Sequence, residues 1–210
     1  MLNKTQIAVV ASGNGTNLQA LIDAQKSGVI KSGVISLVVS NNPRAYALTR
    51  AHDAGIKTAV ISGDRFKSRE AFEGELCRIL SMHGIELIVL AGFMRILSAE
   101  FTSKYPRSII NVHPSLIPSF CGKGFYGLRV HEEALKYGVK VTGATVHYVN
   151  EIPDGGEIIL QKSVCVKSTD TPETLQRRVM EQAEWKLLPK ACEMISKEKK
   201  KKRGKNHECL

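Results

Sequence analysis

Asn111 and His113 stand two residues apart where an apolar run of this 210-residue chain ends. Residues 108–110 continue an extended run. Alternate residues of a strand face the same way, so the side chains of Asn111 and His113 would project from the same face of the sheet. Pro114 and Pro118 fix φ and remove backbone donors, which predicts a shaped loop after the strand. An amide beside an imidazole can donate hydrogen bonds to an oxygen that gains negative charge, and the imidazole can also move a proton near neutral pH. This pattern suits acyl or formyl transfer.

Asp154 could complete such a site, but each of these residues also has a plainer explanation. His113 could be a histidine whose hydrogen bonds are satisfied at the end of a strand, which is the more common case for those residues alone. Asp154 lies in the run I-P-D-G-G and could be only a turn former. If the fold brings the two together, the carboxylate would hold the imidazole tautomer and raise the pKa of His113, keeping a fraction cationic around neutrality. His147 stands on the strand-like run before that turn.

A glycine-rich turn follows the first apolar run. Residues 6–11 (QIAVVA) indicate a buried strand, residues 12–17 are S-G-N-G-T-N, and apolar residues then recur at helical spacing from Leu18. Such a turn directs backbone N–H groups and the positive end of a helix at one place, which suits a phosphate. The turn matches neither G-x-G-x-x-G nor a P-loop, so a tight turn that needs glycine explains it equally well.

Strand-like and helix-like segments alternate along the first half of the chain. After the strand at 6–11, buried strands are predicted at 34–40, 57–61 and 86–91, with helices at 45–54 and 69–82. The alternation repeats before Ile109 and predicts an α/β fold with a doubly wound, mostly parallel sheet.

Two further features could face a ligand at the carboxyl edge of that sheet. The apolar loop at 92–98 (GFMRILS) follows the fourth strand, where parallel α/β sheets place their ligand crevice, although core packing would explain it as well. Arg69 lies near the start of a helix, where the helix dipole disfavours a cation. It could face a carboxylate ligand, although most such residues are merely solvated.

The pattern changes after Ile109. A loop containing C-G-K-G-F-Y-G leads to a helix at 128–137, and two longer strands at 141–149 and 157–166 follow. These strands predict an antiparallel hairpin at one side of the sheet. T-P-E at 171–173 gives a cap and a first-turn proline to a long helix that runs to about Ile195. We therefore expect a single domain over residues 1–196.

The last fourteen residues hold half of the excess positive charge. The net formal charge is +10, and residues 197–210 contain seven Lys or Arg against two Glu, a net +5. This segment has almost no apolar residues, so we predict a basic, solvated and disordered tail. It could bind RNA or another polyanion through phosphate contacts, but no aromatic residues are interleaved to stack bases, and nucleic acid is not the expected partner.

The remaining composition narrows the class of protein. The apolar content of 43% and the charged content of 24% are ordinary for a globular protein. Five scattered cysteines without C-x-x-C spacing indicate neither a disulfide framework nor a zinc site, and no metal is expected. No apolar run reaches membrane-spanning length, and the first strand-like run is too short for the apolar part of a secretory signal, so a cytoplasmic protein is expected.

Four motifs taken together resemble those of a known family. S-G-N-G-T-N after the first strand, A-G-F-M-R-I-L after the fourth, N-V-H-P-S-L-I-P after the fifth and the D-G-G turn are similar to motifs of the folate-dependent phosphoribosylglycinamide formyltransferases. The resemblance spans about residues 6–195. It implies a Rossmann-like formyltransferase fold and transfer of a formyl group from the co-substrate 10-formyltetrahydrofolate to the amine of glycinamide ribonucleotide, in de novo purine biosynthesis and without a metal.

The same resemblance implies roles for individual residues. Asn111 and protonated His113 would stabilise an oxyanion, and Asp154 would raise the pKa of His113. Trp185 stands where His is frequent in the family, and Asn150 stands where an acid is frequent. Glu184 matches the ribose-binding position of the family, and Glu181 matches it less well. The implied contacts to the ribonucleotide are Gly15, Thr16, Asn17 and Glu184, and those to the folate are Arg69, Met94, Arg95, Ile96, Leu97 and Asn111.

Two alternatives to this function remain open. A formyltetrahydrofolate hydrolase would use the same Asn, His and Asp with water as acceptor, but such enzymes usually carry a further amino-terminal domain. The chain could also be a non-catalytic nucleotide or RNA binder that uses the glycine-rich turn and the basic tail. A monomer or a homodimer is expected in any of these cases.

Overall fold

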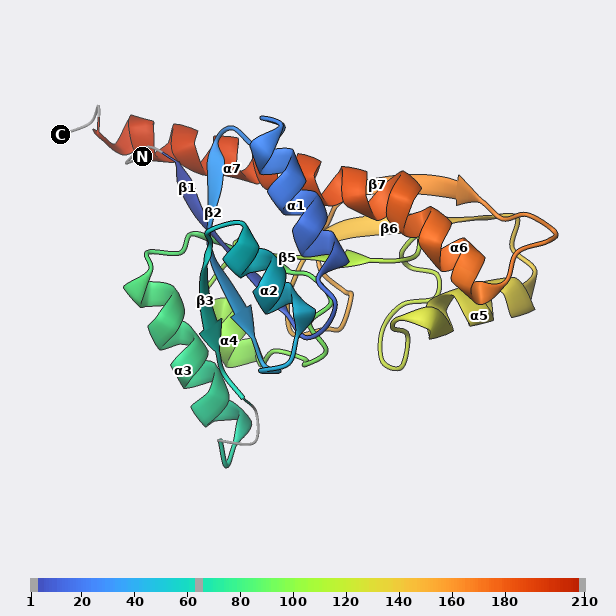
Figure 1. Ribbon diagram of the computed structural model, residues 1–210, viewed down its shortest axis with the longest axis horizontal. Coiled ribbons are helices and arrows are strands. Elements are labelled where there is room, and N and C mark those ends of the chain that lie inside the picture. The colour runs from blue at the N-terminus through green and yellow to red at the C-terminus, as the bar shows by residue number, and fades with distance from the viewer. Residues whose placement is uncertain (1–3, 63–65, 208–210) are drawn as a thin grey trace.

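The computed structural model describes residues 4–62 and 66–207, and a seven-stranded sheet runs through them (Figure 1). The strand order is β3-β2-β1-β4-β5-β6-β7; neighbours from β3 to β5 are parallel, and β5, β6 and β7 are antiparallel. The predicted mostly parallel α/β sheet with an antiparallel hairpin near its C-terminal part is confirmed. The strands are β1 (Thr5–Ala11), β2 (Gly33–Ser40), β3 (Lys57–Val60), β4 (Leu87–Leu90), β5 (Ile109–His113), β6 (Val141–Tyr148) and β7 (Ile158–Cys165).

Both faces of the first strand are buried, which explains why it is apolar at almost every position. Ile7, Val9 and Ala11 of β1 pack into one apolar cluster. Ala8 and Val10 pack into a second cluster, because successive side chains of a strand point to opposite faces. A parallel sheet covered by helices on both sides produces this continuous apolar pattern.

Helices cover the two faces of the sheet (Figure 1). The helical segments are α1 (Thr16–Lys26), α2 (Tyr46–Asp53), α3 (Arg69–Met82), α4 (Ala99–Ser103), α5 (Leu128–Tyr137), α6 (Pro172–Val179), the π-helical segment η2 (Met180–Glu184) and α7 (Trp185–His207). Leu18 of α1, Ala47 of α2 and Leu188 of α7 belong to the cluster on one face. Phe72 of α3 and Phe101 of α4 belong to the cluster on the other. Within residues 4–62 and 66–207, no helix has the length and apolar character needed to cross a membrane.

The C-terminal segment differs from its prediction. A disordered tail was predicted over 197–210, but α7 continues through that segment to His207. Residues 208–210 lie outside the described residues. Lys and Arg have high helix propensity, so a run of them can extend a helix that has already formed. The division of the chain at residue 196 stays a prediction.

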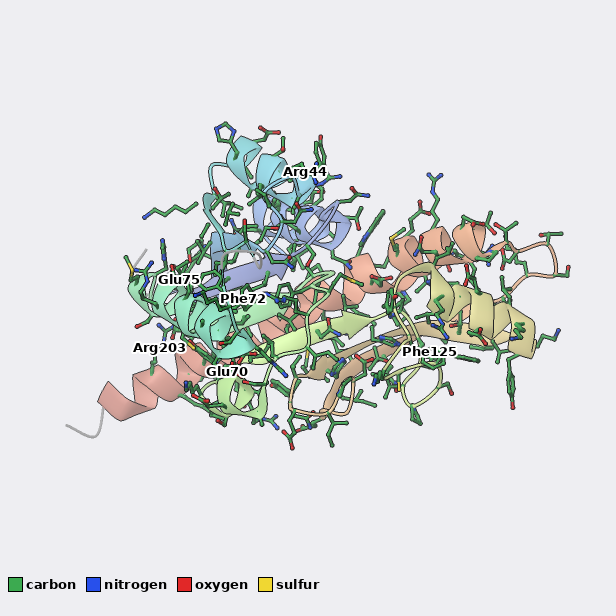
Figure 2. The ribbon with its side chains drawn as sticks, turned by 90° about the horizontal axis from the view of Figure 1, so that it is seen from below. Arg44, Glu70, Phe72, Glu75, Phe125 and Arg203 are labelled. Carbon is green, nitrogen blue, oxygen red and sulfur yellow. The ribbon has the colours of Figure 1, made fainter. Side chains whose placement is uncertain are left out.

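Two cations of this helical extension contact the amino-terminal edge of the sheet. Lys199 Nζ donates to Ser108 Oγ at 2.7 Å, just before β5. Arg203 pairs with Glu86, just before β4, at 3.2 Å, and Figure 2 shows Arg203 on the last part of α7. These contacts give the segment partners that its composition did not reveal.

Candidate active site

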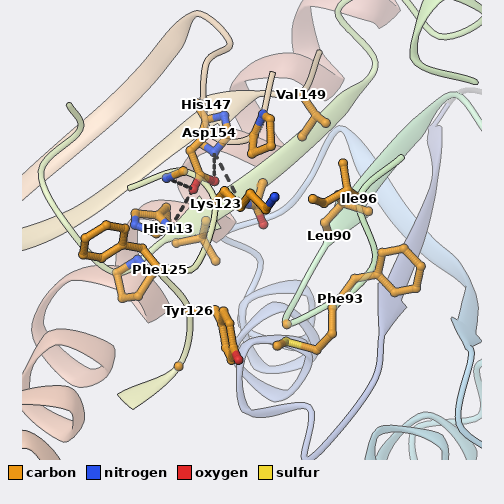
Figure 3. Close-up of a pocket in the computed structure, with 18 of the residues that line it drawn as sticks. Leu90, Phe93, Ile96, His113, Lys123, Phe125, Tyr126, His147, Val149 and Asp154 are labelled. Carbon is orange, nitrogen blue, oxygen red and sulfur yellow. Dashed lines mark hydrogen bonds and ion pairs between the residues drawn. The ribbon is translucent and has the colours of Figure 1, made fainter. Parts of the chain in front are cut away.

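A cavity of about 590 Å³ opens where β4 and β5 end, the edge at which a doubly wound sheet places its ligand crevice. The loop after β4 forms one wall, and the loop 122–127 forms another. Asn17 of α1 and Glu184 of η2 line a further side. Figure 3 shows His113, His147 and Asp154 gathered at one end of the cavity, with Leu90, Phe93 and Ile96 across from them.

Asn111, His113 and Asp154 all line this cavity, and the fold brings the Asp154 carboxylate beside the His113 imidazole. Asn111 and His113 come from alternate positions of β5, and Asp154 reaches them from the turn that joins β6 to β7. Asp154 Oδ2 lies 3.4 Å from His113 Nδ1 and accepts a hydrogen bond from Gly122 N at 2.9 Å. The carboxylate therefore ties the turn to both the imidazole and the loop after β5.

His147 belongs to the same cluster, and sequence reasoning did not assign it to the site. It lies directly opposite Asn111 in the β5–β6 pairing, and its Nε2 is 3.3 Å from Asn111 Nδ2 and 3.5 Å from Asp154 Oδ1. His147 Nδ1 lies 2.8 Å from Tyr148 O, and a carbonyl only accepts, so Nδ1 carries a hydrogen. Nε2 faces both the Asn111 amide and the Asp154 carboxylate, so it accepts from Asn111 when the ring is neutral and donates to Asp154 when the ring is cationic.

His131 of α5 also lines the cavity and is fully buried. Burial lowers the pKa of His131 to about 4, with a smaller contribution from the nearby His113. Neither of its ring nitrogens has a hydrogen-bond partner within the described residues. His131 is therefore a neutral member of the wall at neutral pH.

The protonation of His113 differs from the prediction in one respect. Burial lowers its pKa below the ordinary value for histidine, and His147 lowers it further. Asp154 and the carbonyl of Phe120 raise the pKa, as the sequence predicted for Asp154, but burial outweighs them. The predicted effect of Asp154 is therefore present, but the pKa of His113 in the unliganded site lies below its ordinary value because the residue is only 4% exposed, which the sequence did not reveal.

Both ring nitrogens of His113 face acceptors. Nε2 lies 2.8 Å from Phe120 O, so Nε2 carries a hydrogen and donates it to that carbonyl. Nδ1 faces Asp154. Burial alone would raise the pKa of Asp154, but the His147 hydrogen bond, the charge of His113 and the Gly122 N–H hold it below its ordinary value, so the carboxylate is ionised at neutral pH.

The residues predicted for the ribonucleotide divide into two groups. Asn17 Nδ2 donates to Glu184 Oε2 at 2.8 Å, and both residues line the cavity. Gly15 and Thr16 do not line it; they form the start of α1, where Gly15 has φ 69°. Burial raises the pKa of Glu184 to about 7, and the Asn17 hydrogen bond opposes this rise.

The residues predicted for the folate surround the other wall. Met94, Arg95, Ile96, Leu97 and Asn111 line the cavity, and Met94 and Ile96 are more than half exposed. Arg69 does not line it. Arg69 Nε is 3.1 Å from Glu73 Oε1, and the same oxygen accepts from Ser98 N at 2.8 Å, so Arg69 lies beside the end of this loop.

The other three positions that the family resemblance singled out, Asn150, Trp185 and Glu181, lie at or beyond the edge of the cavity. Asn150 lines the cavity, and its side chain bonds within its own turn, to Gly155 O at 3.4 Å. Trp185 and Glu181 do not line the cavity, and Glu181 pairs with Arg177 at 2.8 Å. In the part of the chain that the structure describes, no three His, Cys, Asp or Glu side chains are grouped as ligands of a metal ion.

A carboxylate, an imidazole and an amide that converge beside an apolar loop, at the edge of this mixed sheet, define a group-transfer enzyme site. A family model described as Formyl transferase matches residues 5–192. The chain belongs to the formyl transferase family.

Within that family its relatives include phosphoribosylglycinamide formyltransferases. The enzyme of that name from Escherichia coli (strain K12) is 44% identical over 176 residues, which are 84% of this chain and 80% of that protein. The trifunctional purine biosynthetic protein adenosine-3 of Gallus gallus is 45% identical over 194 residues, which are 92% of this chain. The chain spans only 19% of the length of that trifunctional protein. The crystal structure of glycinamide ribonucleotide transformylase 1 from Symbiobacterium toebii superposes with a TM-score of 0.87 at 38% identity, covering 94% of this chain and 90% of the other.

Proposed function

We propose that the chain transfers the formyl group of 10-formyltetrahydrofolate to the amine of glycinamide ribonucleotide, a step of de novo purine biosynthesis. The observation that supports this most is the meeting of Asn111, His113 and Asp154 in one cavity. That cavity extends from the loop after β4 to Glu184, so the two substrates would approach the catalytic residues from opposite sides.

The folate would lie along the loop after β4. The exposed side chains of Met94 and Ile96 offer apolar surface to a flat pterin, and Arg95 and Leu97 complete that wall. Arg69, beside the end of the loop, would meet the carboxylate-bearing end of the folate outside the cavity.

The ribonucleotide would occupy the side of the cavity formed by α1 and η2. Asn17 and Glu184 would bind the ribose hydroxyls, and their mutual hydrogen bond already holds them at one place. The phosphate would meet the N–H groups of the turn at Gly15 and Thr16, at the positive end of α1.

Formyl transfer then needs stabilisation of one negative oxygen. The neutral amine attacks the formyl carbon, a C–N bond forms, and the carbonyl oxygen becomes an oxyanion. Asn111 would donate the amide N–H that His147 does not use, and His113 would donate from Nε2 once the formyl oxygen replaces the Phe120 carbonyl as acceptor. Each donor contributes on the order of a few kcal/mol.

The proton that the attacking amine loses is matched by the proton that the leaving folate gains. The attacking nitrogen becomes cationic and loses one proton, the bond between the formyl carbon and N10 breaks, and N10 gains a proton as tetrahydrofolate leaves. Asp154, which is ionised, would help pass this proton, directly or through water. The oxyanion also favours the cationic form of His113, because an opposite charge nearby opposes the effect of burial.

The test is folate product formation, followed by absorbance, with the purified protein and 10-formyltetrahydrofolate in the presence and absence of glycinamide ribonucleotide. Turnover that requires the ribonucleotide is the expected result. Equal folate release without it would mean a hydrolase, and no release in either case would refute the catalytic proposal. The cytoplasmic location and the monomeric or homodimeric state stay predictions.

A further inference from the structure

The glycine-rich turn before α1 is held from behind by α2. Gly13 O accepts a hydrogen bond from Ala47 N at 3.1 Å, and Asn14 O accepts one from Arg50 Nε at 2.9 Å. Ala47 and Arg50 are three residues apart in α2 and therefore lie on one face of that helix. Two consecutive carbonyl groups of the turn are thus bound to the same helix face.

These bonds determine where the N–H groups of the turn point. The peptide bonds between Gly13, Asn14 and Gly15 are trans, and in a trans peptide the N–H points opposite to the C=O. The N–H groups of Asn14 and Gly15 therefore point away from α2, and neither has a hydrogen-bond partner among the described residues. The first N–H groups of α1 add to them, because a helix leaves these groups without internal partners.

The guanidinium of Arg50 has a second connection to the same region. Its Nη1 donates to Gln19 Oε1 on α1 at 2.9 Å, and its Cζ lies 4.9 Å from the centre of the Tyr46 ring. Arg50 therefore links α2 to the turn and to α1 at once. Lysine would keep the charge but not the planar pair of donors that makes both bonds.

The turn also packs against α2 without spare room. Gly15 has φ 69°, and a Cβ at this position would lie 2.8 Å from Ala47 Cβ and 2.9 Å from Ala47 Cα. The turn can approach α2 this closely only with glycine, and the close approach is what brings Asn14 O to Arg50.

We infer that Arg50 is a positioning residue for the phosphate of the substrate. It holds Asn14 O so that the N–H groups of Asn14 and Gly15 are directed at an anion, and it does not line the cavity that contains Asn111, His113 and Asp154. The inference rests on the proposed function for the identity of the substrate. The orientation of these N–H groups would favour binding of any phosphate, so the inference can also be tested with inorganic phosphate.

The first test compares Arg50→Lys and Arg50→Gln with the parent enzyme in the formyl-transfer assay. We expect the KM for the ribonucleotide to rise about tenfold or more, as for loss of a hydrogen bond to a charged group. The kcat at saturation and the KM for the folate should stay within about twofold, because uniform binding is what is lost. A Lys variant with the parental KM would overturn the inference, since charge alone would then suffice.

Arg44→Gln is the matched control. Arg44 precedes α2 and has the same charge, but its guanidinium has no hydrogen-bond partner among the described residues, and Figure 2 shows it at the periphery. Its KM for the ribonucleotide should match the parent's. An equal rise in Arg44→Gln and Arg50→Gln would reveal a general effect of charge and overturn the inference.

The second test needs no turnover. A ligand that binds the folded state raises the melting temperature, so inorganic phosphate should raise it in the parent and less in Arg50→Lys. Equal responses overturn the inference whatever the enzyme catalyses. A weaker response in Arg50→Lys together with no ribonucleotide-dependent turnover in the parent would support the inference and refute only the proposed reaction.

Discussion

Replacing Glu184 with Gln should stabilise the protein at alkaline pH and weaken ribonucleotide binding. Glu184 is 6% exposed, and burial raises its pKa from 4.5 to about 7. A carboxyl group whose pKa is higher in the folded protein stabilises the fold fully below the pKa of the unfolded chain, and this contribution is lost as the pH rises through the folded pKa. A rise from 4.5 to about 7 corresponds to roughly 3 kcal/mol in the free energy of unfolding.

The measurement is urea unfolding of the parent and of Glu184→Gln at several pH values. Gln keeps an oxygen that can accept from Asn17 but carries no charge, so it avoids the cost of a buried carboxylate. Between about pH 5 and about pH 8, its advantage in free energy of unfolding should grow by about 2 to 3 kcal/mol. The KM for the ribonucleotide should rise at the same time, because hydrogen bonds to a charged acceptor are the stronger ones.

Glu181→Gln is the control for that experiment. Glu181 lies on the same helical segment, but its side chain is 46% exposed and pairs with Arg177. An exposed ion pair contributes about 0 to 1 kcal/mol, so the stability of this variant should follow that of the parent at each pH. If Glu184→Gln showed a constant difference from the parent across the pH range, a raised pKa of the buried Glu184 carboxyl group would be refuted.

Three further predictions concern the chemistry and the folate loop. His113→Ala should lose about a hundredfold or more of kcat with little change in ribonucleotide affinity, because an oxyanion donor acts in the transition state; an unchanged turnover number would contradict its role. Asp154→Asn should lower the pKa of His113 further, since Asp154 raises it, and should move to lower pH the alkaline limb of the pH–rate profile, along which activity falls as His113 loses its proton; a profile identical to the parent's would count against the pairing. Glu73→Gln should raise the KM for the folate with little effect on that for the ribonucleotide, because Glu73 holds both Arg69 and Ser98; equal changes in both KM values would refute this.

The periodicity of the sequence was sufficient to locate the main parts of the site. Asn111 and His113 emerge side by side because a strand repeats every two residues, and the loop after β4 lines the cavity because parallel strands end at a common edge. Two helix starts were predicted correctly: α3 spans Arg69–Met82, as expected, and α6 begins at Pro172 after the predicted Thr171 cap.

Contacts between distant segments could not be predicted in the same way. His147 meets Asn111 only through the antiparallel register of β5 and β6, which local patterns do not determine. Its one signal was a histidine within an otherwise apolar strand. The sequence predicted the neighbouring charge that raises the pKa of His113, but not the degree of burial that lowers it. The ordered end of α7 depends on partners more than 90 residues away.

The π-helical segment Met180–Glu184 has a consequence for how this helix can change during evolution. A π turn holds one residue more than an α turn, and such turns arise as single-residue insertions that functional sites retain. The bulge takes up its extra residue locally, so deleting one residue there would restore regular winding without turning α7 relative to α6. Leu187 and Leu188 would stay in the core, and Ser196 O would still accept from Thr5 Oγ1, which lies 3.1 Å away. The loss would fall on the bulge itself, from which Glu184 reaches the cavity, so this part of the helix can change length while the core-facing side of α7 stays the same.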